Sequence, residues 1–363
     1  MLLKLALILL IVVVCLVLSH ISTKVHFNDS RATVSSAYCS LVGAKNLPTD
    51  PVIFVPGIKG SVLTKDGKTI WLGVKQALWN TEPFTYEEHD GVKSSGVFTA
   101  LTIIPLLFEY RPYQRIAAQL ACAQNGHVFY YDWRAYPDDN AQAFGKLVER
   151  VIAETGKKPS VIAHSMGGLI VHGYLKEHPS KINKVVYVSV PFNPGMSYFD
   201  DVNEGAPVGL NKGMLSPEAL ITHPASFLLM PHDGSDRYAG AELMNASTWK
   251  KQKFSVFRDG TGDTAALQQI MDRVKEYHAK LDAPKTLNNS IRIIVSECYL
   301  TVFAIDADGK RSYEPGDGRV SKISAYPFDH VPNMTTSVLC KKHDAQMDDS
   351  EVVKDIFEFL HAR

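Results

Sequence analysis

The sequence lacks a net charge. Its 363 residues include 38 Lys and Arg against 38 Asp and Glu, so the formal charge at pH 7 is zero. A nucleic-acid-binding protein needs a basic surface to neutralise phosphates, so this balance argues against nucleic acid as a partner. Internal repeats and low-complexity stretches are also missing, and 45% of the residues are apolar. Such a composition is typical of a globular chain of one large or two ordinary domains.

Cysteine is scarce. Of five cysteines, four lie beyond the first twenty residues, at Cys39, Cys122, Cys298 and Cys340. This density does not indicate a disulfide-rich scaffold, but an even number in an exported protein permits two disulfides in any of three connectivities. Four buried free thiols are the alternative. The sequence indicates neither a metal nor a cofactor, and it does not specify an oligomeric state.

A long hydrophobic run is lacking too. Residues 5–18 carry no charge and follow Lys4. At ~1.5 Å per residue this stretch covers about 21 Å as a helix, which is short of a ~30 Å hydrocarbon core. The pattern is typical of a signal peptide over residues 1–20. Because Val17 and Ser19 make a weak cleavage site, an uncleaved membrane anchor is the alternative. Either interpretation places the rest of the chain outside the cytosol, whether secreted, periplasmic or in a secretory or lysosomal lumen.

Beyond a linker expected at residues 21–50, short apolar runs alternate with helical patterns. We expect strands at residues 52–55, 127–131, 160–163, 184–190, 291–295 and 335–339, and helices at 113–124, 141–154, 166–177 and from 349 onward. This order predicts an α/β fold with a mostly parallel, doubly wound sheet over residues 51–363. Two stretches break it, and we expect a lid insertion at about 64–110 and a cap insertion at about 192–288.

The segment Ala-His-Ser-Met-Gly at 163–167 lies between a predicted strand and a predicted helix. A tight turn in that place lifts a serine hydroxyl above the sheet edge, which makes Ser165 a candidate nucleophile. Such a turn needs small residues two positions to either side, and Ala163 and Gly167 supply them. A serine that only caps the helix is the alternative.

A nucleophilic serine needs a base, and the base needs a carboxylate to orient it. In this type of fold the chain order is Ser, acid, His, so His343, after the last predicted strand, is the expected base. His330 is the second candidate, while His361 lies at the end of the last helix. His164 is next to Ser165 in the chain, but adjacent residues at a turn point in different directions.

The acid is expected after the strand at 291–295. Asp317 lies in a Gly-flanked turn that suits the presentation of a carboxylate, whereas Asp306 and Asp308 are typical of a hairpin turn. These two also lack the bidentate Glu of a calcium loop.

An oxyanion hole needs two backbone N–H groups. We expect them from Met166, directly after the nucleophile, and from Ile58 in the loop after the first strand.

These motifs together resemble the lecithin:cholesterol acyltransferase family of the α/β-hydrolase superfamily, which includes lysosomal phospholipase A2 and phospholipid:diacylglycerol acyltransferase. The likeness runs over about residues 50–360. It is carried by the opening strand and loop at 51–61, Tyr-Asp-Trp-Arg at 131–134, Ala-His-Ser-Met-Gly at 163–167, Gly-Asp-Gly-Arg-Val at 316–320, and the position of His343. The resemblance implies an α/β-hydrolase fold with a cap or lid and serine-dependent acyl chemistry on lipids.

Two residues depart from the family pattern. Ala163 replaces a Gly, and Arg319 replaces a Thr beside the candidate acid. The cation of Arg319 could lower the pKa of Asp317 or bind a head group. The cysteines do not reproduce the paired pattern of the animal enzyme, so sterol acyl transfer does not carry over.

Substrate contacts are expected from the apolar run at 97–108, which includes Phe98 and Leu101. Such a run suits an acyl-chain groove, a membrane-touching lid with peripheral membrane contact, or plain core packing. Trp133 is either a pocket wall or a structural residue, and its neighbours Asp132 and Arg134 could form an ion pair.

The sequence thus predicts a serine lipase, phospholipase A or O-acyltransferase that passes an acyl group from Ser165 to water or to a lipid alcohol, with a phospholipid as the expected acyl donor. One alternative is a carboxylesterase or thioesterase for small soluble esters. Another is a non-catalytic binding protein built on the same fold.

Overall fold

The central sheet has eight strands, six of which are parallel. In the computed structural model, which describes residues 9–10, 13–14, 24–41, 47–79, 81–104, 108–232, 237–239 and 241–362, their order is β1-β2-β9-β3-β10-β11-β14-β17. The strands are β1 (His26–Asn28), β2 (Arg31–Thr33), β3 (Val52–Val55), β9 (Gly126–Val128), β10 (Ser160–His164), β11 (Lys184–Val188), β14 (Ser290–Ser296) and β17 (Met334–Leu339). The predicted doubly wound α/β architecture is confirmed.

The middle strands are mostly apolar and buried because helices cover them on both faces. All four residues of β3 and all five of β10 are buried. β10 pairs in parallel with β3 on one side and β11 on the other, with Ala163 opposite Val55 and Tyr187. The carboxyl ends of these three strands therefore meet at one edge of the sheet, where the candidate site lies.

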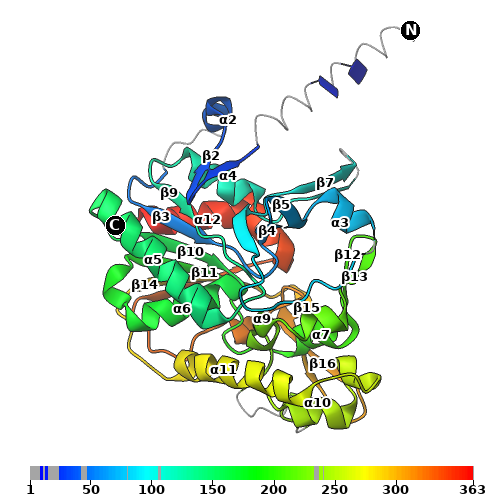
Figure 1. The fold of residues 1–363 in the computed structure, drawn as a ribbon. Helices are drawn as coiled ribbons and strands as arrows, with labels where there is room; N and C mark the ends of the chain where they lie inside the picture. The colour runs from blue at the N-terminus through cyan, green and yellow to red at the C-terminus, as the bar shows by residue number, and fades with distance from the viewer. Residues whose placement is uncertain are drawn as a thin grey trace.

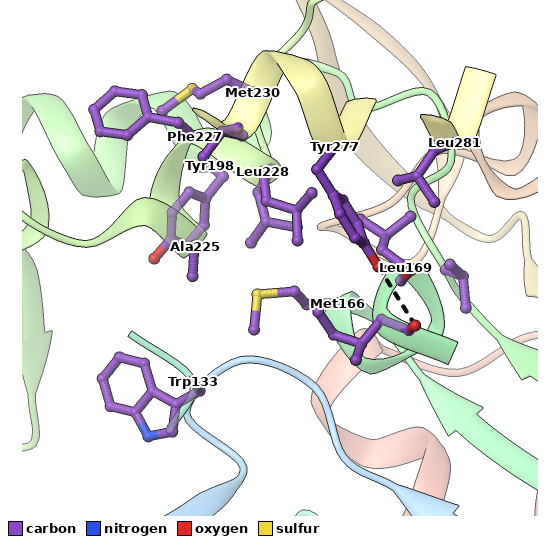
Figure 2. Packing of buried hydrophobic residues seen from close by; sticks show 14 of the residues in the cluster. Trp133, Met166, Leu169, Tyr198, Ala225, Phe227, Leu228, Met230, Tyr277 and Leu281 are labelled. Atoms are coloured by element: carbon purple, nitrogen blue, oxygen red, sulfur yellow. Dashed lines mark hydrogen bonds between the residues drawn. The ribbon is translucent and has the colours of Figure 1, made fainter. Parts of the chain in front are cut away.

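Two hydrophobic clusters fill the two sides of the sheet. Figure 1 shows α5 and α6 in front of the sheet and the red α12 behind it. One cluster includes α5, α6 and α11, and the other includes α4 and α12. These helices are α4 (Gln114–Cys122), α5 (Pro137–Thr155), α6 (Met166–Glu177), α11 (Thr264–Asp282) and α12 (Ser350–His361). In the first cluster the Tyr277 hydroxyl of α11 donates to the Leu169 carbonyl oxygen of α6 at 3.0 Å (Figure 2).

The segment expected as a linker at 21–50 is partly built into the fold. Its β1 and β2 extend the central sheet, since Arg31 of β2 pairs antiparallel with His127 of β9. After them comes α2 (Ser36–Leu41), and Cys39 forms a disulfide with Cys122 of α4. The expectation of a linker is wrong for these residues, because their apolar side chains and a covalent bond attach them to the domain.

The two insertions carry elements of their own. Between β3 and α4 lie β4 (Ser61–Lys65), β5 (Lys68–Trp71), α3 (Val74–Leu78), β6 (Lys93–Val97), β7 (Leu101–Ile104) and β8 (Phe108–Tyr110). Between β11 and β14 lie η2 (Met196–Tyr198), α7 (Phe199–Glu204), β12 (Ala206–Val208), β13 (Asn211–Leu215), α8 (Pro217–Leu220), α9 (Pro224–Leu228), α10 (Ala246–Gln252), η3 (Ser255–Arg258) and α11. α11 differs from the expectation of an insertion above the sheet, because it packs on α6 as a covering helix.

The remaining elements belong neither to the central sheet nor to the two insertions. They are η1 (Pro179–Lys181), β15 (Tyr299–Ile305), β16 (Arg311–Gly316), η4 (Lys322–Ala325) and η5 (His343–Asp348). β15 and β16 form the hairpin predicted around Asp306 and Asp308, where the Asp306 carboxylate accepts the N–H of Asp308 at 3.0 Å.

The proposed signal peptide or anchor at 1–20 lies outside the described residues except for 9–10 and 13–14. Within the described part of the chain, no helix combines the length and apolarity that crossing a bilayer requires. Residues 105–107 of the apolar run at 97–108 also lie outside that part.

Candidate functional site

Ser165 occupies a strained turn between β10 and α6. Its backbone has φ 54° and ψ −133°, a conformation that residues with a side chain rarely adopt. The turn is held by the N–H of Ser165, which donates to the Val188 carbonyl oxygen at 2.9 Å. It also needs Gly167, because a Cβ there would lie 2.2 Å from the carbonyl oxygen of Pro56. The chain thus accepts local strain in order to raise the Ser165 hydroxyl above the sheet.

His343 lies within hydrogen-bond distance of that hydroxyl. It opens η5, directly after β17, and its Nε2 is 2.9 Å from Ser165 Oγ. The two residues are 178 positions apart in the chain, and only the fold brings them together. Two other candidates for the base, His330 and His361, are exposed and absent from the residues that line this site.

Asp317 completes the arrangement on the far side of the imidazole. His343 Nδ1 is 2.7 Å from Asp317 Oδ2, and Gln346 donates to the same oxygen at 3.1 Å. The other oxygen accepts the backbone N–H groups of Arg319 and Val320 at 2.8 and 2.7 Å. Burial alone would raise the pKa of Asp317, but the charge and hydrogen bond of His343, together with the two N–H groups, lower that pKa to about 2.

Arg319 acts on Asp317 differently from what its charge suggested. It is the backbone N–H of Arg319 that contributes to the low pKa of Asp317. The guanidinium group instead pairs with Asp201 of the cap at 3.2 Å.

His164 lies beside the site without touching the Ser165 hydroxyl. Its ring centroid is 4.7 Å from that of His343, and its Nδ1 accepts from the Tyr113 hydroxyl at 2.9 Å. The same hydroxyl accepts the N–H of Gly57 at 3.0 Å, in the loop after β3. Burial lowers the pKa of His164 well below its usual value, which keeps the ring neutral.

Sequence reasoning missed Tyr113 and Gln346, because nothing local marks a residue that supports a site from a distant element.

Of the two expected oxyanion donors, Met166 follows Ser165 directly in the chain, and Ile58 belongs to a different loop. Met166 opens α6, so its N–H is one of the donors that the helix itself leaves free. Its side chain is buried in the core (Figure 2), so the role expected of Met166 in the site is one for its backbone. Ile58 lies in the loop after β3 and lines the same cavity as Ser165.

A cavity of about 760 Å³ opens in front of Ser165. Phe98 and Leu101, two of the expected substrate contacts, line it. Both insertions contribute further apolar residues to its wall, among them Leu72, Ala77, Val208, Leu215 and Leu229. Charged side chains stand along one part of the wall, namely Lys59, Asp201, Arg319, Lys342 and Asp344.

The expectation that Trp133 contacts substrate is wrong. The indole is 0% exposed and belongs to the hydrophobic core shown in Figure 2, outside the cavity lining. It packs edge-on against Trp71 with ring centroids 4.9 Å apart. The expected pair of its neighbours is present, since Arg134 Nη2 lies 2.7 Å from Asp132 Oδ2. The Tyr-Asp-Trp-Arg segment is therefore structural, as the second interpretation of it proposed.

One family model matches about half of the chain. The family model of lecithin:cholesterol acyltransferase matches residues 121–298, which contain Ser165 and end before Asp317 and His343. The resemblance noted from the sequence is thereby confirmed.

Two curated relatives extend the comparison. The uncharacterized protein YJR098C of Saccharomyces cerevisiae is 24% identical over 320 residues, which cover 85% of this chain and 46% of the relative. Phospholipase A(1) LCAT3 of Arabidopsis thaliana is 25% identical over 223 residues, which cover 50% of this chain and 47% of the relative. The chain therefore spans about half the length of the curated relatives it matches.

Solved structures are similar in fold. The Tle4–Tli4 complex aligns with a TM-score of 0.50 and 11% identity, over 86% of this chain and 98% of that chain. The mature lipase BlEst2 of Bacillus licheniformis aligns with a TM-score of 0.40 and 12% identity, over 87% and 93%. The parallel sheet, the strand–turn–helix at Ser165 and the likeness to the Tle4–Tli4 complex show that the chain has the α/β-hydrolase fold.

Proposed function

We propose that this protein is a serine-dependent lipid acyl hydrolase or O-acyltransferase that forms an acyl-enzyme on Ser165. The observation that carries this proposal is the chain of contacts from Ser165 Oγ through His343 to Asp317 at the wall of a largely apolar cavity. A nucleophile, a base and an orienting carboxylate in hydrogen-bond contact are the parts that acyl transfer needs. The family match and the fold support acyl chemistry on lipids in general.

In the first half-reaction Ser165 Oγ attacks the ester carbonyl while its proton passes to His343 Nε2. Asp317 holds the imidazole and stabilises the positive charge that forms on it. The N–H groups of Ile58 and Met166 donate to the oxyanion of the tetrahedral intermediate. His343 then returns the proton to the leaving alcohol oxygen as the ester C–O bond breaks.

In the second half-reaction an acceptor hydroxyl takes the place of that alcohol. His343 removes its proton, the hydroxyl oxygen attacks the acyl carbonyl, and the ester bond to Ser165 breaks with return of the proton to Ser165 Oγ. Water as acceptor gives a lipase or phospholipase A, and a lipid alcohol gives an acyltransferase. The two outcomes share every residue of the site and differ in the access of water to one intermediate.

The apolar wall supports an acyl lipid, with a phospholipid as the preferred donor. Burial of each methylene group contributes about 0.8 kcal/mol, so a long chain along Phe98 and Leu101 can be bound without attraction between charges. The relative from Arabidopsis thaliana carries the name phospholipase A(1), which supports the same class of substrate.

We further propose that the catalytic domain works outside the cytosol and contacts membranes peripherally. The disulfides Cys39–Cys122 and Cys298–Cys340 support an oxidising compartment.

Two assays on the purified full chain test the proposed function. A fluorophosphonate probe should label the wild-type protein and leave Ser165→Ala unlabelled, and failure to label the wild type contradicts a serine mechanism. A phospholipid with a labelled acyl chain, offered with and without a lipid alcohol, should then yield a free fatty acid or a new ester. A series of esters of increasing chain length decides the substrate class, because a preference for short soluble esters would replace the lipid assignment by a carboxylesterase.

A further inference from the structure

One carboxylate joins the cap to both loops that serve Ser165. Asp201 lies in α7, and its side chain is only 12% exposed. Its two oxygens pair with the two terminal nitrogens of Arg319, each at 3.2 Å. Oδ2 of the same carboxylate also lies 3.5 Å from Lys59 Nζ. We call Lys59, Asp201 and Arg319 the ionic clamp.

Each cation of the clamp belongs to a loop that carries a proposed catalytic group. Lys59 follows Ile58, and its backbone has φ 64°, a left-handed conformation that a residue with a side chain adopts at a cost. Its carbonyl oxygen accepts Trp71 Nε1 at 3.0 Å, which fixes the loop from the other side.

Arg319 plays the same part in the acid loop. Its backbone N–H donates to Asp317 Oδ1 at 2.8 Å, while its guanidinium reaches Asp201 and the Ser197 carbonyl oxygen at 3.0 Å. The side chain of Arg319 thus attaches to the cap at two places, and its main chain holds the carboxylate that faces His343.

The clamp is more than a surface ion pair. Solvent screens exposed pairs and leaves them little net stabilisation, whereas partly buried pairs are screened less. Burial lowers the pKa of Lys59, and the Asp201 carboxylate beside it opposes that effect. Removal of the carboxylate would therefore leave two cations near each other in a partly buried place.

We propose that Asp201 is a positioning residue for acyl transfer, holding the Ile58 loop through Lys59 and the Asp317 loop through Arg319 against the cap. This inference rests on the proposed function. It assigns Asp201 no contact with the substrate, because its effect passes through the two loops.

The clamp predicts a specific kinetic signature. An oxyanion donor acts on the transition state and not on the bound ester, so its displacement lowers kcat and leaves KM nearly unchanged. Complete loss of one donor lowers kcat by about 10²–10³-fold. Asp201→Asn, which displaces the loop without removing the N–H, should lower kcat by about 10–100-fold and slow fluorophosphonate labelling of Ser165 by a similar factor.

Four further variants separate positioning from simple stability. Asp201→Glu keeps the charge and should recover part of the lost kcat. Arg319→Gln removes one cation, whose side chain is 46% exposed, and keeps the backbone N–H that donates to Asp317. This milder change should fold even if Asp201→Asn does not. A triple variant, Lys59→Met with Asp201→Leu and Arg319→Leu, removes all three charges. Glu204→Gln on the same helix breaks the exposed pair with Arg258 and should leave kcat and KM unchanged.

The outcomes are distinguishable when kcat, KM, labelling rate and melting temperature are measured together on the full chain. The inference predicts that the triple variant stays slow even where its melting temperature returns toward that of the wild type. Full kcat in Asp201→Asn, in Arg319→Gln or in the triple variant overturns it while the proposed function stands. A wild-type protein that neither reacts with the probe nor cleaves an ester overturns the proposed function, and the inference with it.

Discussion

His343 and Asp317 face each other through one short contact, 2.7 Å between Nδ1 and Oδ2. An ionised carboxylate can only accept hydrogen bonds, so the proton of a neutral imidazole lies on Nδ1 and the lone pair on Nε2 faces Ser165. The second carboxylate oxygen is already occupied by the N–H groups of Arg319 and Val320. The acid loop therefore fixes both the position of Asp317 and the tautomer of His343.

Asp317→Asn should lower turnover by about 10⁴-fold, because an amide can donate to Nδ1 and turn the lone pair of His343 away from Ser165. Ester hydrolysis by the purified variant, with its melting temperature recorded, measures this effect. Asp306→Asn, in the exposed hairpin turn, is the matched control and should keep wild-type turnover. Equal losses in both variants would show that Asp317 has no special role.

Stability should fall at low pH through Asp317. Folding lowers the pKa of this carboxyl from 3.8 to about 2, so the folded state favours the ionised form. Its contribution to stability is complete above pH 3.8 and is lost as the pH falls toward 2. Urea unfolding at several pH values should show a steeper decline over this range for the wild type than for Asp317→Asn. Parallel curves would contradict the lowered pKa.

Gly167→Ala should damage both stability and activity. The added methyl group would lie 2.2 Å from the Pro56 carbonyl oxygen, and backbone cannot move away as a side chain can. Overpacking of this kind costs about 1–3 kcal/mol, and relief by a shift of the turn would move Ser165. Gly73→Ala serves as control, since its Cβ meets only the end of the Gln76 side chain at 2.8 Å. Full activity in Gly167→Ala would show that the turn tolerates a Cβ.

Truncation of Trp133 should affect mainly stability, whereas truncation of Leu101 should affect mainly the choice of substrate. Trp133→Ala removes a fully buried ring and should cost about 3–5 kcal/mol of unfolding free energy. Leu101 is half-buried at the cavity wall, so Leu101→Ala should change the preferred acyl-chain length with a smaller loss of stability. Denaturant unfolding and a chain-length series measure the two effects. An unchanged chain-length preference in Leu101→Ala would remove this residue from the acyl site.

The disulfide Cys298–Cys340 should support the position of His343, which follows Cys340 by three residues. Closure of a loop of this length stabilises the folded state by about 2–4 kcal/mol. Cys298→Ala with Cys340→Ala should therefore lower both the melting temperature and kcat. The pair Cys39→Ala and Cys122→Ala, at α2 and α4, should lower the melting temperature with kcat retained. If kcat is equal in both double variants, the disulfide Cys298–Cys340 does not support the position of His343.

Much of the fold could be predicted because the central strands are mostly apolar and alternate with helices that have a periodic apolar face. Strands β3 and β10 and helix α6 begin and end close to where the pattern predicts. The strands β1 and β2 could not be predicted, since each has three residues and a mixed pattern of burial. Such short strands at one end of the sheet exist through pairing with their neighbours and leave no periodicity of their own.

The residues of the site were predictable where a local turn or the order of elements along the chain marks them, as the order does for His343. Ser165 lies between strand and helix, and Asp317 lies in a Gly-flanked turn, so each could be found from its neighbours. Asp201 has no such mark, because its partner Arg319 is 118 positions away. The role of Trp133 could not be predicted for a related reason. An indole in a motif suits a core or a pocket equally well, and only the burial of the side chain in the structure distinguishes the two roles.

Detection of the acyl-enzyme tests the central claim most directly. The full-length protein is mixed with a phospholipid whose acyl chain is labelled, the reaction is stopped with acid, and the labelled peptide is identified by mass spectrometry. The account predicts an acyl ester on Ser165 in the wild type, its absence in Ser165→Ala, and a loss of turnover in that variant of about 10⁵–10⁶-fold. Acyl label on a different residue, or turnover near the wild-type rate in folded Ser165→Ala, would contradict it.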